Sequence, residues 1–210
     1  MLYRRFFKTI FDGLLAAVGL ALLSPVVCLL ALLIRLRLGR PVLFRQVRIG
    51  LGDKPFVFLK FRTMTDLKDR DGKLLPDDKR LTRLGRFLRA GSLDELPQLW
   101  NVVKGDMSLI GPRPLLPEYL SRYSAFQRRR HEVKPGITGL AQVKGRNSIS
   151  WEDKFNLDVQ YVDRCSAGLD LRILLMTISS VVRREGISQE GHATMPEFMG
   201  SGTPSNQGSR

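Results

Sequence analysis

The chain has 210 residues, and 43% of them are hydrophobic, which is enough for one folded domain with a membrane segment. Lys and Arg total 34 against 20 Asp and Glu; the formal net charge of +14 points to an anionic partner, which could be nucleic acid, lipid head groups or a phosphorylated small molecule. The two cysteines, Cys28 and Cys165, and the two histidines, His131 and His192, argue against a disulfide framework, a histidine metal site and a histidine-based triad.

An apolar stretch without any charge runs from Gly13 to Ile34. At ~1.5 Å rise per residue, a helix of this length can cross a hydrocarbon core of ~30 Å. A cleaved signal peptide is disfavoured, because no small-x-small cleavage site follows and the stretch runs into arginines. Two alternatives remain: a helix that spans the membrane, and a helix that enters and leaves on one side.

Two features of the stretch favour the second alternative. Basic residues, which prefer the cytoplasmic side, flank both of its ends. They are Arg4, Arg5 and Lys8 before the stretch and Arg35, Arg37 and Arg40 after it. Proline at Pro25, in the middle, removes a backbone donor and kinks a helix, and the Ser24 hydroxyl could bond a carbonyl freed there. We therefore predict that residues 1–36 form a re-entrant membrane helix broken at Ser24 and Pro25.

Beyond this stretch, the pattern is that of a folded domain. Two runs rich in β-branched and aromatic residues, Pro41–Gly50 and Pro55–Arg62, predict two short strands joined by a turn. Lys60 and Arg62 alternate with an apolar residue and so share one face of the second strand. A charged loop follows over Asp66–Asp78.

The remaining elements follow from helical spacing, glycines and prolines. The first is a helix with Leu81, Leu84 and Leu88 on one face and the basic stripe Arg80, Arg83, Arg86 and Arg89. An amphipathic helix from Leu96 to Val103, a strand over Met107–Gly111 and a helix over Pro117–Arg130 should follow. We then expect a glycine-rich basic loop over Lys134–Arg146, which would bring backbone N–H groups to an anion, and helices over Trp151–Val162 and Leu169–Arg184.

These elements predict an α/β fold that is mostly helical with a few short strands. Asp158 lies on the apolar face of the helix that starts at Trp151, where a buried carboxylate needs a partner or a function. The broad apolar surface of the Leu169–Arg184 helix suits either the core or the membrane interface, where amphipathic helices lie. We expect residues 37–199 to form a cytosolic, membrane-associated catalytic domain, and residues 200–210 to be a disordered tail.

Asp94 and Glu95 are adjacent carboxylates, and the pair has two interpretations. In the first, Ser92-Leu-Asp-Glu95 is a capping box at a helix start. In the second, the helix starts at Pro97, because proline is favoured at the first helical position. Either arrangement puts the carboxylates near the positive end of a helix dipole, which should keep them ionised and nucleophilic.

An ionised carboxylate such as Asp94 can attack phosphorus to form an acyl phosphate. Its approach to a negative diphosphate requires cations, and Mg²⁺ is commonly held by one or two carboxylates together with phosphate oxygens. Glu95 is therefore a candidate Mg²⁺ ligand. The candidate phosphate ligands are Lys60, Arg62, Arg89, Arg113 and Arg146.

Several motifs together resemble one known family. They are Ser24-Pro25 in the apolar stretch, Lys60-Phe-Arg62-Thr-Met64, Arg83-Leu-Gly-Arg-Phe-Leu-Arg89, Asp94-Glu-Leu-Pro-Gln-Leu-Trp-Asn101, Gly105-Asp-Met-Ser-Leu-Ile-Gly-Pro-Arg-Pro114 and Lys134-Pro-Gly-Ile-Thr-Gly-Leu-Ala-Gln-Val143. In this order, over about residues 1 to 185, they resemble the bacterial sugar transferases, the monotopic phosphoglycosyl transferase family. The C-terminal stretch Glu185–Phe198 is most similar to the branch that transfers diacetylbacillosaminyl-phosphate.

The resemblance implies a two-step reaction. Asp94 attacks the sugar-bearing phosphate of a UDP-sugar and expels UMP, and polyprenol phosphate then takes the phosphosugar from the enzyme. Glu95 would hold Mg²⁺. Lys60, Asp158 and Asp170 match further polar positions associated with activity, although Asp170 could equally cap the helix that begins at Leu171. A re-entrant helix broken at Ser-Pro and a place on the cytoplasmic face of the bacterial inner membrane are also implied.

The resemblance further implies an N-acetylated amino sugar as the transferred group, with a hexose from UDP-glucose or UDP-galactose as the alternative. The partners expected are the UDP-sugar, undecaprenyl phosphate and anionic phospholipid, with a homodimer as a further expectation. A basic scaffold on the membrane surface is the non-enzymatic alternative, but it leaves Asp94, Glu95 and Asp158 unexplained. A nucleic-acid partner is not expected, because no aromatic-basic stacking motif is present.

Overall fold

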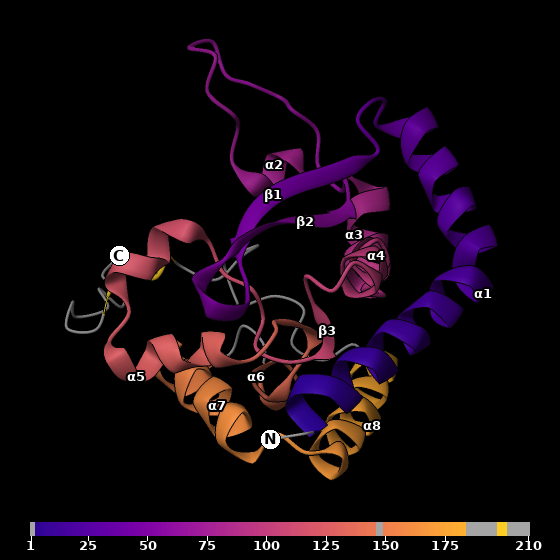
Figure 1. Cartoon of the computed structure of the whole chain (residues 1–210). Helices are drawn as coiled ribbons and strands as arrows, with labels where there is room; N and C mark the ends of the chain where they lie inside the picture. Colours follow the sequence, from indigo (N-terminus) through magenta and orange to yellow (C-terminus); the bar gives the residue numbers. More distant parts are fainter. Residues whose placement is uncertain (1–2, 146–148, 184–196, 201–210) are drawn as a thin grey trace.

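The computed structural model describes residues 3–145, 149–183 and 197–200. Helices dominate, with four short strands in the described part of the chain, so the predicted fold class is confirmed (Figure 1). The α-helices are α1 (Lys8–Arg37), α2 (Asp77–Arg80), α3 (Arg83–Ala90), α4 (Gln98–Val103), α5 (Ala125–Arg128), α6 (Leu140–Lys144), α7 (Trp151–Arg164) and α8 (Ala167–Arg183). The strands are β1 (Leu43–Ile49), β2 (Pro55–Phe61), β3 (Ser108–Ile110) and β4 (Gly136–Thr138).

Helix α1 has 30 residues and is long and apolar enough to cross a membrane. Its helical backbone continues through Pro25, so the predicted break is not an interruption, although Figure 1 shows the axis changing direction along its length. Proline at position 25 leaves the carbonyl of Ala21 without its usual N–H partner. The Ser24 hydroxyl donates to that carbonyl at 2.8 Å, as the sequence suggested. Re-entrant placement in a membrane stays a prediction.

Strands β1 and β2 form the predicted antiparallel hairpin, with Leu43 opposite Phe61 and Ile49 opposite Pro55. The free edge of β2 is completed by a side chain of α4. Asn101 accepts from the Leu59 N–H at 3.1 Å and donates to the Val57 carbonyl at 2.7 Å. This exchange fixes α4 against the strand that carries Lys60.

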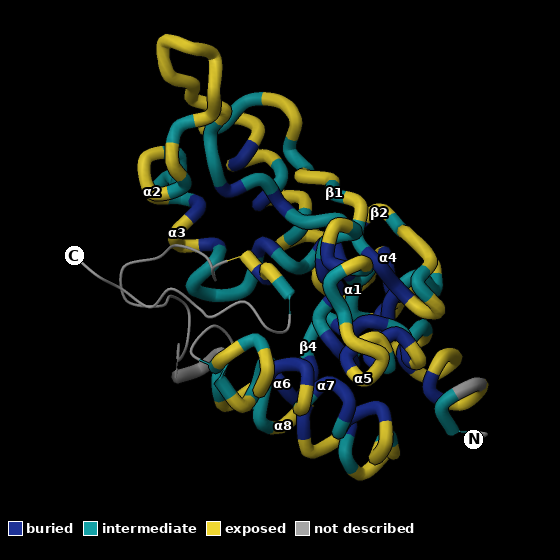
Figure 2. The backbone as a smooth tube through the Cα atoms, turned by 90° about the vertical axis from the view of Figure 1, so that its left-hand side faces the viewer, coloured by how far each residue is buried: buried dark blue, intermediate teal, exposed yellow. Residues whose placement is uncertain are grey.

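Small apolar clusters join α1 to the rest of the fold. In one of them, Leu30 and Ile34 of α1 pack with Phe61 of β2 and Leu88 of α3, and partly buried Leu93 and Leu96 complete it. Figure 2 shows buried positions concentrated in the middle of the molecule and along α6 and α7, and exposed positions along the loop that projects at the top. Because Leu93 and Leu96 flank the carboxylate pair, this cluster places Asp94 and Glu95 beside α1.

The predicted helix over Pro117–Arg130 is wrong as a single element. The structure has a 3₁₀ helix at Pro117–Arg122, then α5, then a second 3₁₀ helix at Arg129–Glu132. Ser124 causes the interruption, because it forms a capping box with Gln127 and starts a new helix. Tyr119 is consequently buried, whereas Phe126 is 47% exposed.

The glycine-rich segment Lys134–Arg146 is not the predicted loop, since β4 and α6 occupy most of it. Its glycines serve close packing instead. A Cβ at Gly136 would lie 2.1 Å from the Gly111 nitrogen, and a Cβ at Gly139 would lie 2.1 Å from the Gly111 oxygen. The Gly136 N–H donates to the Pro112 carbonyl at 3.0 Å, so it holds the segment before Arg113 and does not face an anion.

Candidate active site

Asp94 lies in a short 3₁₀ helix, Leu93–Glu95, between α3 and α4. Ser92 makes no capping hydrogen bond with its side chain and has a φ of 53°, so the capping-box interpretation is wrong. Helix α4 begins at Gln98 with Pro97 as its cap residue, close to the start predicted by the second interpretation. The two carboxylates therefore lie in the turn that precedes α4.

The Asp94 side chain is buried, and the residue is 6% exposed. Burial raises the pKa of Asp94, the Glu95 charge raises it further, and Lys60, Arg113 and Arg89 offset part of this effect. The effect of burial on the pKa of Asp94 thus outweighs the lowering expected from the positive end of the following helix. The neighbouring cations favour the ionised carboxylate. No side chain among the described residues donates a hydrogen bond to Asp94.

Three basic side chains surround this carboxylate. Burial and the nearby Arg89 lower the pKa of Lys60 to about 8. The Arg89 Nε donates to the Thr63 hydroxyl at 3.1 Å, which ties α3 to the end of β2. Arg113 Nη2 donates to Glu95 Oε1 at 2.7 Å, and the Glu95 charge raises the pKa of Arg113. Lys60, Arg89 and Arg113 are therefore brought together with Asp94 and Glu95, as the sequence placed them in one site.

Asp158 is buried on α7 and forms an ion pair with Arg130 at 2.7 Å. This is the partner that its apolar surroundings required. Arg130 also donates to the Arg113 carbonyl at 2.7 Å and to the Tyr123 hydroxyl at 3.3 Å. Asp158 thus supports the backbone of Arg113 through Arg130 and makes no contact of its own with Asp94; a direct role in binding substrate stays a prediction.

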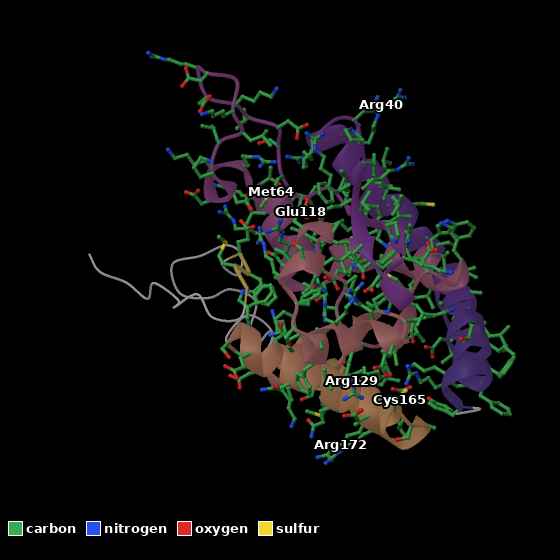
Figure 3. All side chains as sticks on the ribbon, turned by 60° about the vertical axis from the view of Figure 1, so that its left-hand side comes forward. Arg40, Met64, Glu118, Arg129, Cys165 and Arg172 are labelled. Carbon is green, nitrogen blue, oxygen red and sulfur yellow. The ribbon has the colours of Figure 1, made fainter. Side chains whose placement is uncertain are left out.

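Arg62 and Asp170 lie outside this group. Arg62 donates to the carbonyls of Met64, Leu38 and Arg40 and pairs with Asp66, so it closes the segment after α1. Figure 3 shows Arg40 and Met64 at the upper end of the molecule.

Asp170 lies in the first turn of α8, three residues after its start, so it is not the cap residue that the sequence suggested. It accepts from Lys8 Nζ, Tyr3 Oη and Tyr161 Oη, each at 2.7 Å, and thereby links the start of α1 to α7 and α8. Figure 3 shows its neighbours in sequence, Cys165 and Arg172, at the lower end of the molecule. Arg146 lies outside the described residues.

Comparison with known proteins settles the class. The pattern of the family described as bacterial sugar transferase matches residues 3–184. The chain is 56% identical over 200 residues to the uncharacterized sugar transferase EpsL of Bacillus subtilis, covering 95% of this chain and 98% of that protein. It is 42% identical over 193 residues to a UDP-glucose:undecaprenyl-phosphate glucose-1-phosphate transferase of Caulobacter vibrioides, covering 83% and 69%. The chain belongs to the bacterial sugar transferase family.

A third relative of this transferase is the UDP-galactose-lipid carrier transferase of Erwinia amylovora, 40% identical over 200 residues that cover 87% of this chain and 42% of that protein. The names of the second and third relatives specify a hexose, which supports the hexose alternative over the amino sugar. The branch that transfers diacetylbacillosaminyl-phosphate is not supported by these names, and residues 185–196 of the stretch on which it rested lie outside the described residues.

Sequence reasoning missed three basic residues of the transferase, two of them buried (Arg130 and Lys154) and one half-buried (Arg48). Besides Arg130, they are Arg48 of β1, whose Nη1 donates to the Pro114 carbonyl at 3.4 Å, and Lys154 of α7, whose Nζ lies 4.6 Å from the centre of the Trp151 ring. Lys154 precedes Asp158 by one helical turn, so their shared face was a signal that could have found it. Arg48 and Arg130 had no such local signal.

Basic side chains outnumber acidic ones around the site. Among the described residues, the acidic members are Asp94, Glu95, Glu118 and Asp158, and the basic members are Arg48, Lys60, Arg89, Arg113, Arg130 and Lys154. Gathering like charges in a buried or half-buried site is unfavourable unless an anion compensates them. The arrangement therefore suits a diphosphate.

The two carboxylates fit a Mg²⁺ ion that is shared with substrate. Within the described part of the chain, no group of three or more Asp, Glu, His or Cys side chains could cage a metal without substrate. Adjacent Asp94 and Glu95 supply the one or two carboxylates that Mg²⁺ commonly takes alongside phosphate oxygens. Glu95 would hold the ion by the oxygen that does not face Arg113.

Proposed function

We propose that this transferase moves a hexose-1-phosphate from a UDP-hexose to undecaprenyl phosphate and releases UMP. The observation that carries the proposal is the buried Asp94 carboxylate, which accepts no hydrogen bond from the described side chains and is surrounded by Lys60, Arg89 and Arg113. The relatives named for transfer of glucose-1-phosphate or galactose to a lipid carrier support the choice of donor and acceptor.

The first half-reaction would be an attack of an Asp94 carboxylate oxygen on the sugar-bearing phosphorus. A new phosphorus–oxygen bond forms to Asp94, the bond to the UMP phosphate breaks, and UMP leaves with that electron pair. In the second half-reaction, a phosphate oxygen of undecaprenyl phosphate attacks the same phosphorus, and Asp94 leaves as a free carboxylate. This two-step scheme is that of covalent catalysis with ping-pong kinetics.

The surroundings of Asp94 suit a nucleophile. Desolvation makes the carboxylate more basic, and its attack on phosphorus then replaces weakly solvated charge by a covalent bond. Lys60, Arg89 and Arg113 lie where negative charge develops on the transferred phosphoryl group. A bound Mg²⁺ would neutralise diphosphate charge in the same region.

Membrane association follows from the exposed apolar side chains. They include Phe7 just before α1, Phe11, Leu22 and Leu36 of α1, Phe87 of α3, Trp100 of α4 and Leu171, Leu175 and Ile178 of α8. Such a surface lowers its free energy by entering the interface of a bilayer. We propose the cytoplasmic face of the inner membrane, where a UDP-sugar and a lipid-linked acceptor can meet.

The decisive experiment is a single half-reaction without acceptor. Purified protein in detergent or nanodiscs is incubated with Mg²⁺ and UDP-glucose or UDP-galactose labelled in the sugar. We expect release of at most about one UMP per enzyme and a labelled protein. Asp94→Asn should abolish both, whereas the exposed control Asp78→Asn should not.

A donor panel tests the sugar. We expect labelling by UDP-glucose or UDP-galactose to be faster than labelling by UDP-N-acetylated amino sugars. The opposite order would restore the amino sugar as the transferred group. Multiple UMP released without any labelled protein would contradict the covalent mechanism.

A further inference from the structure

Residues 197–200, which we call the C-terminal segment, are held on the catalytic domain by one buried side chain. Phe198 is 4% exposed, and its N–H donates to the Tyr119 hydroxyl at 3.3 Å. Arg122 donates to the Phe198 carbonyl and, at 2.7 Å, to Glu197 Oε1. An aromatic anchor, backbone hydrogen bonds and one paired carboxylate are the contacts by which proteins hold a short peptide. The C-terminal segment is therefore bound like a ligand that is tethered to its own protein.

Four aromatic rings form the site that receives Phe198. The centre of its ring lies between 4.9 and 5.9 Å from theirs, within the range over which aromatic pairs attract. We call these rings the aromatic cage; they belong to Tyr119, Tyr123, Trp151 and Phe155. Figure 3 shows the C-terminal segment, in yellow, beside the 3₁₀ helix that carries the labelled Glu118. The cage thus encloses one aromatic side chain from the end of the chain.

The cage is continuous with the segment that carries Arg113. Leu115, two residues after Arg113, is buried in the same apolar cluster as Phe155 and Phe198. Its carbonyl accepts from the Ile49 N–H at 3.1 Å, which fixes this part of the chain against the end of β1. Removing the Phe198 ring would leave a cavity beside Leu115, into which the surrounding structure relaxes only partly. Occupation of the cage therefore supports the main chain just after Arg113.

A second link between the cage and Arg113 runs through Arg130. The Arg130 guanidinium lies 5.9 Å from the centre of the Tyr123 ring and 5.6 Å from that of Phe155. It donates to the Tyr123 hydroxyl at 3.3 Å and to the Arg113 carbonyl at 2.7 Å. The rings that enclose Phe198 thus also position the side chain that fixes Arg113.

We propose that Phe198 is a positioning residue of the transferase: its docking in the aromatic cage holds Arg113 where it contacts Glu95 and serves the transferred phosphoryl group. Phe198 acts through Leu115 and Arg130 and not by contact with substrate. The effect on activity rests on the proposed function, in which the same phosphoryl group passes Arg113 in both half-reactions. Loss of the Phe198 ring should therefore slow both of them, since a misplacement of about 1 Å can cost about 100-fold in rate.

The test supplies the missing ring from outside. Full-length Phe198→Ala leaves the cage without its ring, and a synthetic peptide of residues 195–202 provides one. At saturating UDP-hexose we expect the variant to be labelled about tenfold or more slower than wild type, and its transfer from preformed labelled enzyme to undecaprenyl phosphate to slow similarly. Increasing peptide should restore both rates. The same peptide with alanine in place of its phenylalanine should restore neither.

Trp151 reports occupation of the cage independently of activity. The chain has two tryptophans, so in a Trp100→Phe background the fluorescence comes from Trp151 alone. We expect Phe198→Ala to shift this emission to longer wavelength, because water then reaches the indole, and the peptide to reverse the shift. The peptide concentration at half effect should be the same for the emission and for the labelling rate.

Two further variants complete the design. Met199→Ala changes the neighbour of Phe198, a side chain that is 62% exposed, and should alter neither the emission nor either rate. If Phe198→Ala melts well below wild type, Phe198→Leu takes its place, because it keeps an apolar anchor and loses only the ring. Labelling of Phe198→Leu should still be slower than wild type by about threefold or more.

A wild-type rate in the variant without the ring would overturn the proposal. So would a peptide that restores the Trp151 emission without restoring the two rates. Failure of the wild-type protein to become labelled would instead contradict the proposed function itself, and the emission would still show whether Phe198 occupies the cage. The two failures are therefore distinguishable in one set of measurements.

Discussion

Arg130 donates a hydrogen bond to the backbone carbonyl of Arg113 at 2.7 Å while its guanidinium pairs with Asp158. Both members of that ion pair are almost completely buried, with side chains 1% and 2% exposed. The pair therefore holds the main chain of the residue that contacts Glu95. A structural ion pair and the candidate active site are in this way one connected unit.

Removing one member of the pair should destabilise the protein strongly. Arg130→Met leaves the Asp158 carboxylate buried without a partner, which typically costs about 3–5 kcal/mol. The double variant Arg130→Met, Asp158→Leu should lose clearly less stability than the single variant, because neither charge of the pair then remains buried without the other. Denaturant unfolding in a fixed detergent measures both. Equal losses in the single and double variants would contradict the explanation.

The pH dependence of enzyme labelling should be bell-shaped. Attack requires ionised Asp94, whose pKa is raised by burial, so the acid limb should lie above the range of an exposed aspartate. Lys60, with a pKa of about 8, loses its charge as the pH rises, and donor binding weakens with it. Lys154 has a similar pKa and would act in the same range.

The alkaline limb near pH 8 should therefore move upward when these lysines are replaced by arginine. Lys60→Arg combined with Lys154→Arg keeps both charges to high pH, because arginine stays protonated. Initial rates of UMP release from about pH 5 to about pH 10 are the measurement. An alkaline limb that does not move would assign it to another group.

Re-entrant placement predicts that both ends of α1 face the cytoplasm. In a Cys28→Ser, Cys165→Ser background, cysteines introduced as Arg4→Cys and Arg40→Cys should both resist a membrane-impermeant thiol reagent in intact cells. Both should react after the cells are opened. Labelling of only one of them in intact cells would show a spanning helix. Pro25→Leu, which restores the backbone donor, should favour the spanning form.

Close packing beside the segment that carries Arg113 predicts that substitution by alanine has opposite effects on stability at two glycines, Gly136 and Gly168. A Cβ at Gly136 would lie 2.1 Å from the Gly111 nitrogen, so Gly136→Ala should cost at least about 1–3 kcal/mol and reduce activity through the displaced segment. At Gly168 in α8, a Cβ would have no neighbouring atom within 4 Å, and Gly168→Ala should stabilise by up to about 1 kcal/mol. Thermal unfolding and labelling rates check both.

Local patterns in the sequence were sufficient for part of this description. Runs rich in β-branched and aromatic residues predicted β1 and β2, and helical spacing predicted α7 with Asp158 on its buried face. The motif around Asp94 and Glu95 singled out the two carboxylates that the structure groups with Lys60, Arg89 and Arg113. The Ser24 hydroxyl could likewise be matched to a carbonyl freed by Pro25. Each of these inferences depends on residues a few positions apart, where backbone geometry fixes which side chains share a face.

The tertiary structure decided which charges are buried together. Arg130 meets Asp158 across 28 positions and Arg113 meets Glu95 across 18, distances in sequence over which no periodicity operates. The tertiary structure also sets the Arg62 side chain against backbone carbonyls and packs Gly136 and Gly139 tightly against Gly111. The type of a residue determines which chemistry its side chain can perform. The electrostatic interactions of a charged side chain become strong only when folding removes water and fixes its neighbours. Those neighbours come from distant parts of the chain.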